Sequence, residues 1–160
     1  MSARAAMLAL AALASPASAA CPVELAVYTD RDAVASLDFR PAGKAAAVTN
    51  RFRMAIGDTI LDGMVMWSEG VARPYGMLTW HCPEGDVTGP EYEACTLWQG
   101  VIYSADDTGA IGLLPAEGDA APARLIFSDL AYALAARQEG PGPRLGALPW
   151  DVFSLSGCQE

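Results

Sequence analysis

The chain has 160 residues, of which 52% are hydrophobic, and 19 acidic against 10 basic residues give a formal net charge of −9. This length suits one domain with a buried core, and the negative charge repels phosphate backbones and anionic lipid headgroups. We therefore expect no nucleic-acid partner and no stable membrane insertion, whereas a basic protein remains a charged partner that the composition allows.

The N-terminal residues 1–20 have the pattern of an export signal. Arg4 is their only charge, and an apolar stretch covers residues 5–14. About ten residues rise roughly 15 Å as a helix, half of the ~30 Å hydrocarbon core, so this stretch is too short for a stable anchor. Pro16 and the small residues 17–20 then suit a signal peptidase acting at Ala19 or Ala20. We predict a signal peptide over 1–20 and a single mature domain over 21–160, located in the periplasm or secreted.

Cys21 raises the alternative of a lipoprotein anchored by acyl chains at that cysteine. Lipoprotein signals usually carry Leu three residues before the cysteine, where this chain has Ser18. Lipidation of Cys21 would also leave three cysteines, an odd number, in an oxidising compartment. Anchoring at Cys21 is therefore the less favoured hypothesis.

Four cysteines allow three pairings, and their places in the chain favour one of them. Cys82 and Cys95 flank a single loop, while Cys21 and Cys158 lie at the two ends of the mature chain. We predict the disulfides Cys82–Cys95 and Cys21–Cys158. In the chain-entropy model they contribute about 3 and roughly 5 kcal/mol.

From residue 23 onward, apolar residues alternate with polar ones, and turn residues recur every eight to twelve positions or so. The pattern predicts strands over residues 23–29, 36–40, 46–54, 60–67, 77–82, 96–104, 110–114 and 150–158. The turn at residues 106–109 gives the clearest hairpin. We expect a mainly β fold, an antiparallel barrel or sandwich of about eight strands.

One short helix is predicted in the C-terminal half, over residues 129–137, with Ser128 as its N-cap. Residues 138–149 contain three prolines and three glycines, which is typical of an irregular surface crossing. Residues 83–93 read as an acidic loop.

The sequence offers no motif that carries a reaction, and we predict no catalytic residue, metal or cofactor. His81 is the single histidine, which excludes a histidine pair, and neither Gly-x-Ser-x-Gly nor Ser-x-x-Lys occurs. We weighed His81 as a general base or as a zinc ligand with Cys82 and Cys95, and favour a structural role. Calcium sites at Asp30 with Asp32, or at Asp106 with Asp107, are less favoured than ordinary turns.

The most suggestive feature is the acidic segment between Cys82 and Cys95. It holds Glu84, Asp86, Glu91 and Glu93, with Tyr92 among them. A segment clamped at both ends presents charge on a preorganised scaffold, which lowers the ordering cost of binding a basic surface. The alternative is a loop whose charges only keep it solvated.

Four stretches of the chain carry a resemblance to known sequences, namely residues 82–89 (CPEGDVTG), 98–103 (WQGVIY), 112–115 (GLLP) and 149–153 (PWDVF). They resemble a set of uncharacterised exported proteins from alphaproteobacteria. The resemblance implies a periplasmic address over nearly the whole mature chain, and it implies no activity or site residue.

Two classes of function remain open. The favoured one is a non-enzymatic periplasmic binding or inhibitor-type protein. The alternative is a cell-envelope hydrolase, which would need two carboxyl groups roughly 5 to 10 Å apart in a cleft, one of them with a raised pKa.

Overall fold

The computed structural model describes residues 20–44, 47–67, 70–85, 88–140 and 142–160. It is mainly β, with 46% strand and 13% helix. Its elements in chain order are the 3₁₀ turn η1 (Val23–Leu25), β1 (Ala26–Asp30), β2 (Ala35–Arg40), β3 (Val48–Ile56), β4 (Thr59–Trp67), β5 (Pro74–Thr79), α1 (Gly89–Cys95), β6 (Thr96–Ala105), β7 (Ile111–Leu113), β8 (Arg124–Phe127), α2 (Leu130–Arg137) and β9 (Val152–Cys158).

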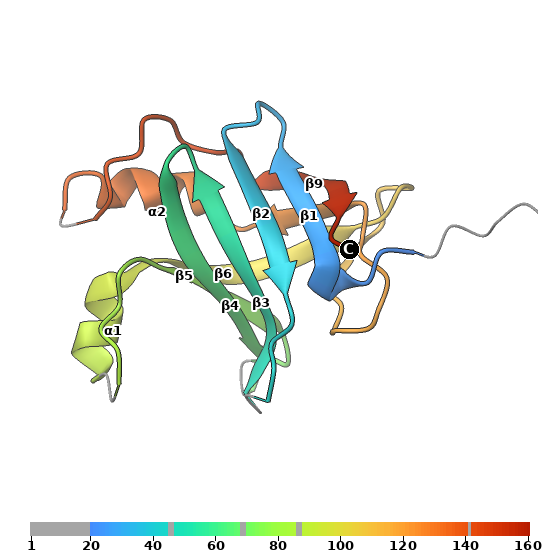
Figure 1. Ribbon diagram of the computed structural model, residues 1–160, viewed down its shortest axis with the longest axis horizontal. Helices are drawn as coiled ribbons and strands as arrows, with labels where there is room; N and C mark the ends of the chain where they lie inside the picture. The colour runs from blue at the N-terminus through green and yellow to red at the C-terminus, as the bar shows by residue number, and fades with distance from the viewer. Residues whose placement is uncertain (1–19, 45–46, 68–69, 86–87, 141) are drawn as a thin grey trace, which may run out of the picture.

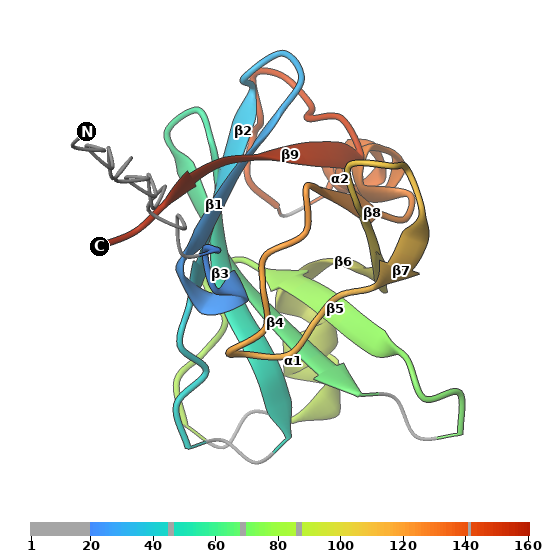
Figure 2. The ribbon, with the colours of Figure 1, turned by 90° about the vertical axis from the view of Figure 1, so that its right-hand side faces the viewer.

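The strands close into an eight-stranded antiparallel barrel (Figures 1 and 2). Each strand from β1 to β6 pairs with the next in chain order. The barrel is then closed by the pairs β6–β8, β8–β9 and β9–β1. One additional strand, β7, lies outside this closed ring and pairs with the last residues of β6. Of the two architectures that the pattern allowed, barrel and sandwich, the barrel is the one adopted.

Aromatic rings from six barrel strands occupy the centre of the barrel. Phe127 has ring contacts with Phe52 at 5.7 Å, Phe153 at 5.3 Å and Trp98 at 5.3 Å between centroids. Phe39 lies 5.4 Å from Phe52 and 5.9 Å from Tyr28, which extends the contacts across the barrel. All six side chains are buried. A ligand inside the barrel would have to displace this packed core.

Both predicted disulfides are confirmed. Cys21 bonds to Cys158 with a Cα–Cα distance of 5.8 Å, and Cys82 bonds to Cys95 at 5.2 Å. The first bond fits the pairing of β1 with β9, in which Ala26 lies opposite Cys158. Two disulfides indicate a non-reducing compartment. The predicted signal peptide over 1–20 lies outside the described residues except for Ala20.

No helix among the described residues has the length and apolar character needed to cross a bilayer.

The structure corrects several predicted elements. Residues 23–25 form η1 rather than the start of a strand, and the fifth strand is Pro74–Thr79, a few residues earlier than predicted. β8 was not predicted, because its four residues are too few to establish a period. The helix in the C-terminal half is confirmed, but α1 is a second one, inside the segment predicted as a loop.

The N-terminus of α2 also differs from prediction. Asp129, not Ser128, is the N-cap, and it makes no side-chain capping bond. Ser128 instead donates its hydroxyl to the Val101 carbonyl at 3.1 Å. The carboxylate of Asp151, just before β9, accepts the Ala131 backbone N–H at 2.8 Å. A residue distant in sequence therefore satisfies the first turn of this helix.

Candidate functional site

The acidic segment folds into a short helix held at both ends. Thr88 lies in extended backbone before α1, and Pro90 occupies the first turn, where a missing N–H costs nothing. The Glu91 carboxylate accepts the Thr88 backbone N–H at 3.0 Å and the Thr88 hydroxyl at 2.6 Å. α1 ends at Cys95, which returns to Cys82 through the disulfide. These contacts fix the segment at its start and its end.

α1 is also fixed to the barrel wall. The half-buried Tyr92 donates its hydroxyl to the sulfur of Met64, on β4, at 3.3 Å. The Tyr92 carbonyl accepts the Thr96 hydroxyl at 2.7 Å, and the Cys95 carbonyl accepts the Trp80 N–H at 2.9 Å. Burial raises the pKa of Tyr92, as expected for a phenol removed from water. Tyr92 thus holds α1 against the barrel and is only partly available to a partner.

The predicted acidic residues have different surroundings. Glu84, Glu91 and Glu93 are all exposed. The carboxylate of Glu91 accepts the capping hydrogen bonds from Thr88 at the start of α1, and these bonds lower the pKa of Glu91. Glu93 lines a groove beside α1. Asp86 lies outside the described residues.

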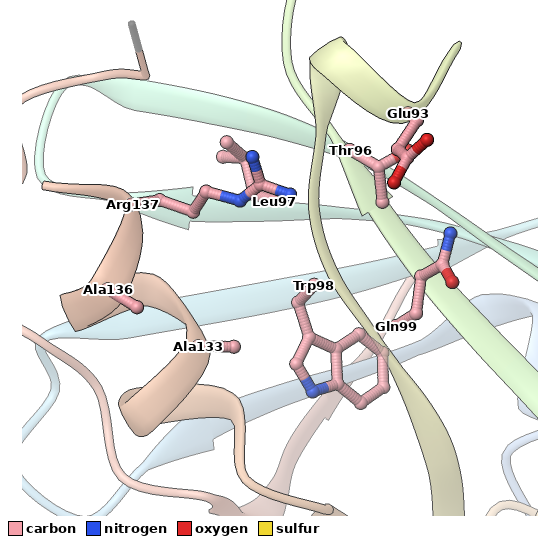
Figure 3. A pocket seen from close by; sticks show the side chains of 8 residues that line it. All are labelled: Glu93, Thr96, Leu97, Trp98, Gln99, Ala133, Ala136 and Arg137. Atoms are coloured by element: carbon pink, nitrogen blue, oxygen red, sulfur yellow. The ribbon is translucent and has the colours of Figure 1, made fainter. Parts of the chain in front are cut away.

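This groove, here called the α2 groove, runs between α2 and the first half of β6 (Figure 3). It consists of two adjoining open hollows that share Leu97 and Arg137. The full lining is Trp80, His81, Glu93, Ala94, Cys95, Thr96, Leu97, Trp98, Gln99, Ala133, Ala136, Arg137 and Gly142.

Charged and apolar residues both line the α2 groove. Arg137 extends from the end of α2 toward Leu97, and Glu93 lies on the α1 side (Figure 3). The methyl groups of Ala133 and Ala136 leave the wall formed by α2 low and apolar. One groove therefore offers an acidic side chain, a basic side chain and an apolar surface to a bound partner.

His81 lies at the end of this groove nearest the disulfide. Its backbone has φ 50°, an uncommon conformation for a residue other than glycine, and its ring stacks on Trp80 with centroids 4.1 Å apart. Among the described residues, the stacked Trp80 ring is the contact that orients the imidazole. The zinc site with Cys82 and Cys95 is overturned, because both sulfurs are in a disulfide.

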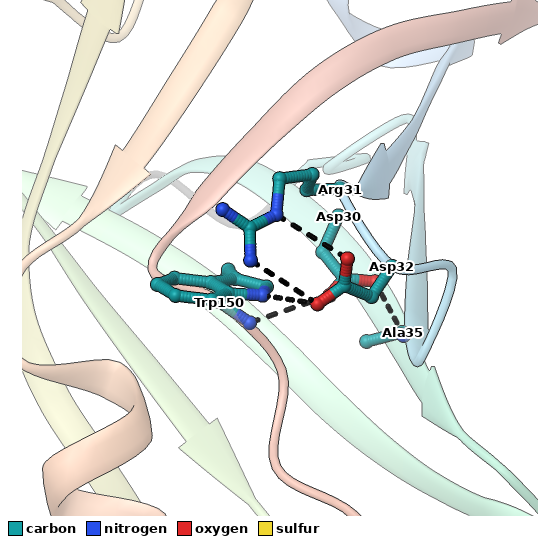
Figure 4. Close-up of polar contacts among 5 residues, drawn as sticks. All are labelled: Asp30, Arg31, Asp32, Ala35 and Trp150. Atoms are coloured by element: carbon teal, nitrogen blue, oxygen red, sulfur yellow. Dashed lines mark hydrogen bonds and ion pairs between the residues drawn. The ribbon is translucent and has the colours of Figure 1, made fainter.

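Of the aspartates considered as calcium ligands, Asp30 and Asp106 accept hydrogen bonds from neighbouring turns and loops. Asp30 is buried, and its carboxylate accepts the backbone N–H groups of Ala35 at 2.8 Å and Trp150 at 3.3 Å (Figure 4). Asp106 closes its turn by accepting the N–H and hydroxyl of Thr108 at 2.8 and 2.6 Å. Over the described residues, no three potential ligand side chains cluster as in a metal site.

The carboxyl groups with perturbed pKa values are all more acidic than usual. A hydrogen bond from the Trp150 indole, then one from Arg31, lower the pKa of Asp32, and the Thr108 hydroxyl does so for Asp106. Glu91 is the third such group. A glycosidase-type acid needs the opposite shift, so these groups are unsuited to that role.

No family model, curated protein sequence or solved structure matches this chain.

Sequence reasoning found the acidic side of this site but missed Arg137 and the alanines of α2. Nothing in the sequence links them, because Glu93 and Arg137 are far apart in the chain and line the same hollow only after the barrel closes.

Proposed function

We propose that this is an exported, non-enzymatic binding or inhibitor-type protein that docks a basic protein partner on α1 and the adjoining α2 groove. The observation that carries the proposal is the disulfide-clamped α1, which holds exposed Glu93 beside a groove of mixed polar and apolar lining, with exposed Glu84 in the same disulfide loop. A surface already ordered before binding loses little entropy on association.

The electrostatics of the segment favour a cationic partner. Between Cys82 and Cys95 every charged residue is acidic. Exposed acids of one sign raise the association rate of a basic surface more than they strengthen the final complex. Affinity would come from apolar contacts in the groove, and Arg137 would bind a carboxylate or carbonyl of the partner.

An exported address supports the same proposal. We infer that residues 1–20 are removed as a signal peptide, and the two disulfides are compatible with the periplasm or the extracellular space. The hydrolase alternative has less support. Hydrogen bonds from neighbouring residues lower the pKa of each carboxyl group whose pKa is perturbed, whereas the acid of such an enzyme needs a raised pKa.

The test begins with capture of a partner. The mature protein, residues 21–160, is immobilised and exposed to periplasmic extract, and the basic proteins it retains are purified. Association rates are then measured at several salt concentrations for the wild type and for a variant with Glu84→Gln, Asp86→Asn, Glu91→Gln and Glu93→Gln. Glutamine at 91 can still cap α1. We expect slower association and a weaker salt dependence for this variant.

A matched control carries the same change in charge elsewhere on the surface, at the exposed residues Asp58, Asp107, Asp119 and Glu160, each converted to its amide. This control should associate at nearly the wild-type rate. If both variants associate equally fast, or both slow equally, the acidic segment is not the docking surface.

A further inference from the structure

A second cluster of charge lies on the outer wall of the barrel, over β2, β3 and β4. Three arginines line one hollow there, together with Asp62, and Asp38 is paired with Arg40 at its edge, so the group has one net positive charge in a protein of net charge −9. The residues that line the hollow are Arg40, Pro41, Arg51, Phe52, Arg53, Asp62, Gly63 and Met64.

The strand register places two of these arginines directly opposite each other. Arg40 on β2 pairs with Arg51 on β3, so their Cβ atoms are about 5 Å apart. Like charges at directly opposite positions destabilise a sheet. The neighbour of Arg51 on its other side is Met64, which is uncharged.

The other two arginines of the hollow each lie beside a carboxylate. Arg40 donates from Nε and Nη2 to Asp38 at 2.9 and 2.7 Å, and Arg53 lies 3.5 Å from Asp62. Within the described ranges, Arg51 forms no ion pair. The pairing with Asp38 also restricts the orientation of the Arg40 guanidinium, while Arg51 keeps its five donors.

From these observations we infer that the hollow binds a phosphate group between Arg40 and Arg51. A phosphate monoester carries about −1.5 to −2 charges at neutral pH, so it can pair fully with Arg51 and still attract the guanidinium of Arg40. It also offers three acceptor oxygens, enough for donors from two strands, whereas a carboxylate has one charge and two oxygens. Bound phosphate would turn the unfavourable Arg40–Arg51 juxtaposition into a bridged contact.

The phosphate group can belong to a small soluble molecule or to a lipid headgroup, and the experiment separates these sources. The mature protein is titrated with glycerol phosphate at constant ionic strength, and backbone amide signals are followed by NMR. We expect saturable shifts at residues 40, 51, 53 and 62–64. In parallel, flotation with phosphatidic acid vesicles, compared with phosphatidylcholine vesicles, tests the headgroup, because phosphatidic acid carries a phosphate monoester.

Arg51→Gln is the decisive variant, and Arg124→Gln, an exposed arginine on β8, is its control. Loss of at least tenfold in affinity, for either source, in Arg51→Gln alone supports the site. Glycerol phosphate should raise the melting temperature of the wild type but not of Arg51→Gln. Without phosphate, Arg51→Gln should melt at the same temperature or higher, because it removes a like-charge pair.

The inference is overturned if neither source binds, or if Arg51→Gln and Arg124→Gln bind as the wild type does. Shifts that grow linearly and are reproduced by sodium chloride would also overturn it, since they indicate general screening. Neither reagent involves the protein partner proposed for α1, so failure of one proposal leaves the other intact.

Discussion

The carboxylate of Asp30 accepts the backbone N–H of Trp150 at 3.3 Å, although the two residues are 120 positions apart in the chain. Asp30 ends β1 and is only 4% exposed, and its other oxygen holds Ala35 at the start of β2. One buried side chain thus joins the β1–β2 turn to the crossing that leads into β9 (Figure 4).

We expect Asp30→Ala to lower the free energy of unfolding by about 2 to 4 kcal/mol, since an unpaired buried donor such as the Ala35 N–H costs about 1 to 3 kcal/mol and the partly buried Trp150 N–H costs less. Urea denaturation at neutral pH measures this loss. Asp58→Asn, at an exposed turn residue, should stay within about 0.5 kcal/mol of the wild type. An equally small change for Asp30→Ala would show that water replaces both contacts.

Trp150→Phe tests the adjacent pair, because it removes the indole N–H that donates to Asp32 at 2.6 Å while keeping a ring under Arg31. In the wild type, the hydrogen bond from the Trp150 indole is the largest cause of the lowered pKa of Asp32, and the one from Arg31 is the next. In Trp150→Phe this pKa should therefore rise toward its ordinary value of 3.8. A carboxyl group whose pKa is lower in the folded state than in the unfolded state stabilises the protein at pH values above the unfolded-state pKa. This stabilisation is lost as the pH falls through the folded-state pKa.

The stability difference between wild type and Trp150→Phe should therefore be largest near neutral pH and shrink as pH falls below the ordinary value of 3.8. NMR titration of the Asp32 carboxyl and denaturation at several pH values measure the two effects. An unchanged titration of Asp32 would rule out the indole as the cause.

Gly63→Ala should be strongly destabilising, because an added Cβ would lie 2.3 Å from Cε2 of Phe52 in the packed core. Overpacking of this kind costs about 1 to 3 kcal/mol. Gly146→Ala is the control, since a Cβ there meets no atom within 4 Å. Thermal melts of both variants make the comparison, and equal melting temperatures would mean that Phe52 can move without cost.

The two disulfides should differ in what their removal changes. Cys21→Ser with Cys158→Ser opens a loop of sequence separation 137 and should cost roughly 5 kcal/mol, while Cys82→Ser with Cys95→Ser opens one of 13 and should cost about 3 kcal/mol. Amide exchange should rise throughout the barrel in the first variant. In the second it should rise mainly in residues 82–95, and protection retained there would show that Tyr92 and the capping box suffice to order α1.

Local signals were enough to predict much of the fold. The alternation in β2, where Ala35, Leu37 and Phe39 are buried, is visible in the sequence because a strand facing one core has a period of two. The helix α1 was also visible, since Thr88 and Glu91 have capping-box spacing, but the acidic composition led us to predict a loop.

Other features depended on contacts between distant parts of the chain. β8 is a strand because β6 and β9 provide hydrogen-bonding partners on both sides, and Asp151 caps α2 only because the crossing returns there. The sequence by itself determined the strand periodicity and the acidic segment, and it favoured the disulfide pairing that the structure contains, since each follows from spacing along the chain. Only the tertiary structure placed Arg137 and Glu93 in one groove and Arg40 opposite Arg51, because barrel closure and strand register set those positions.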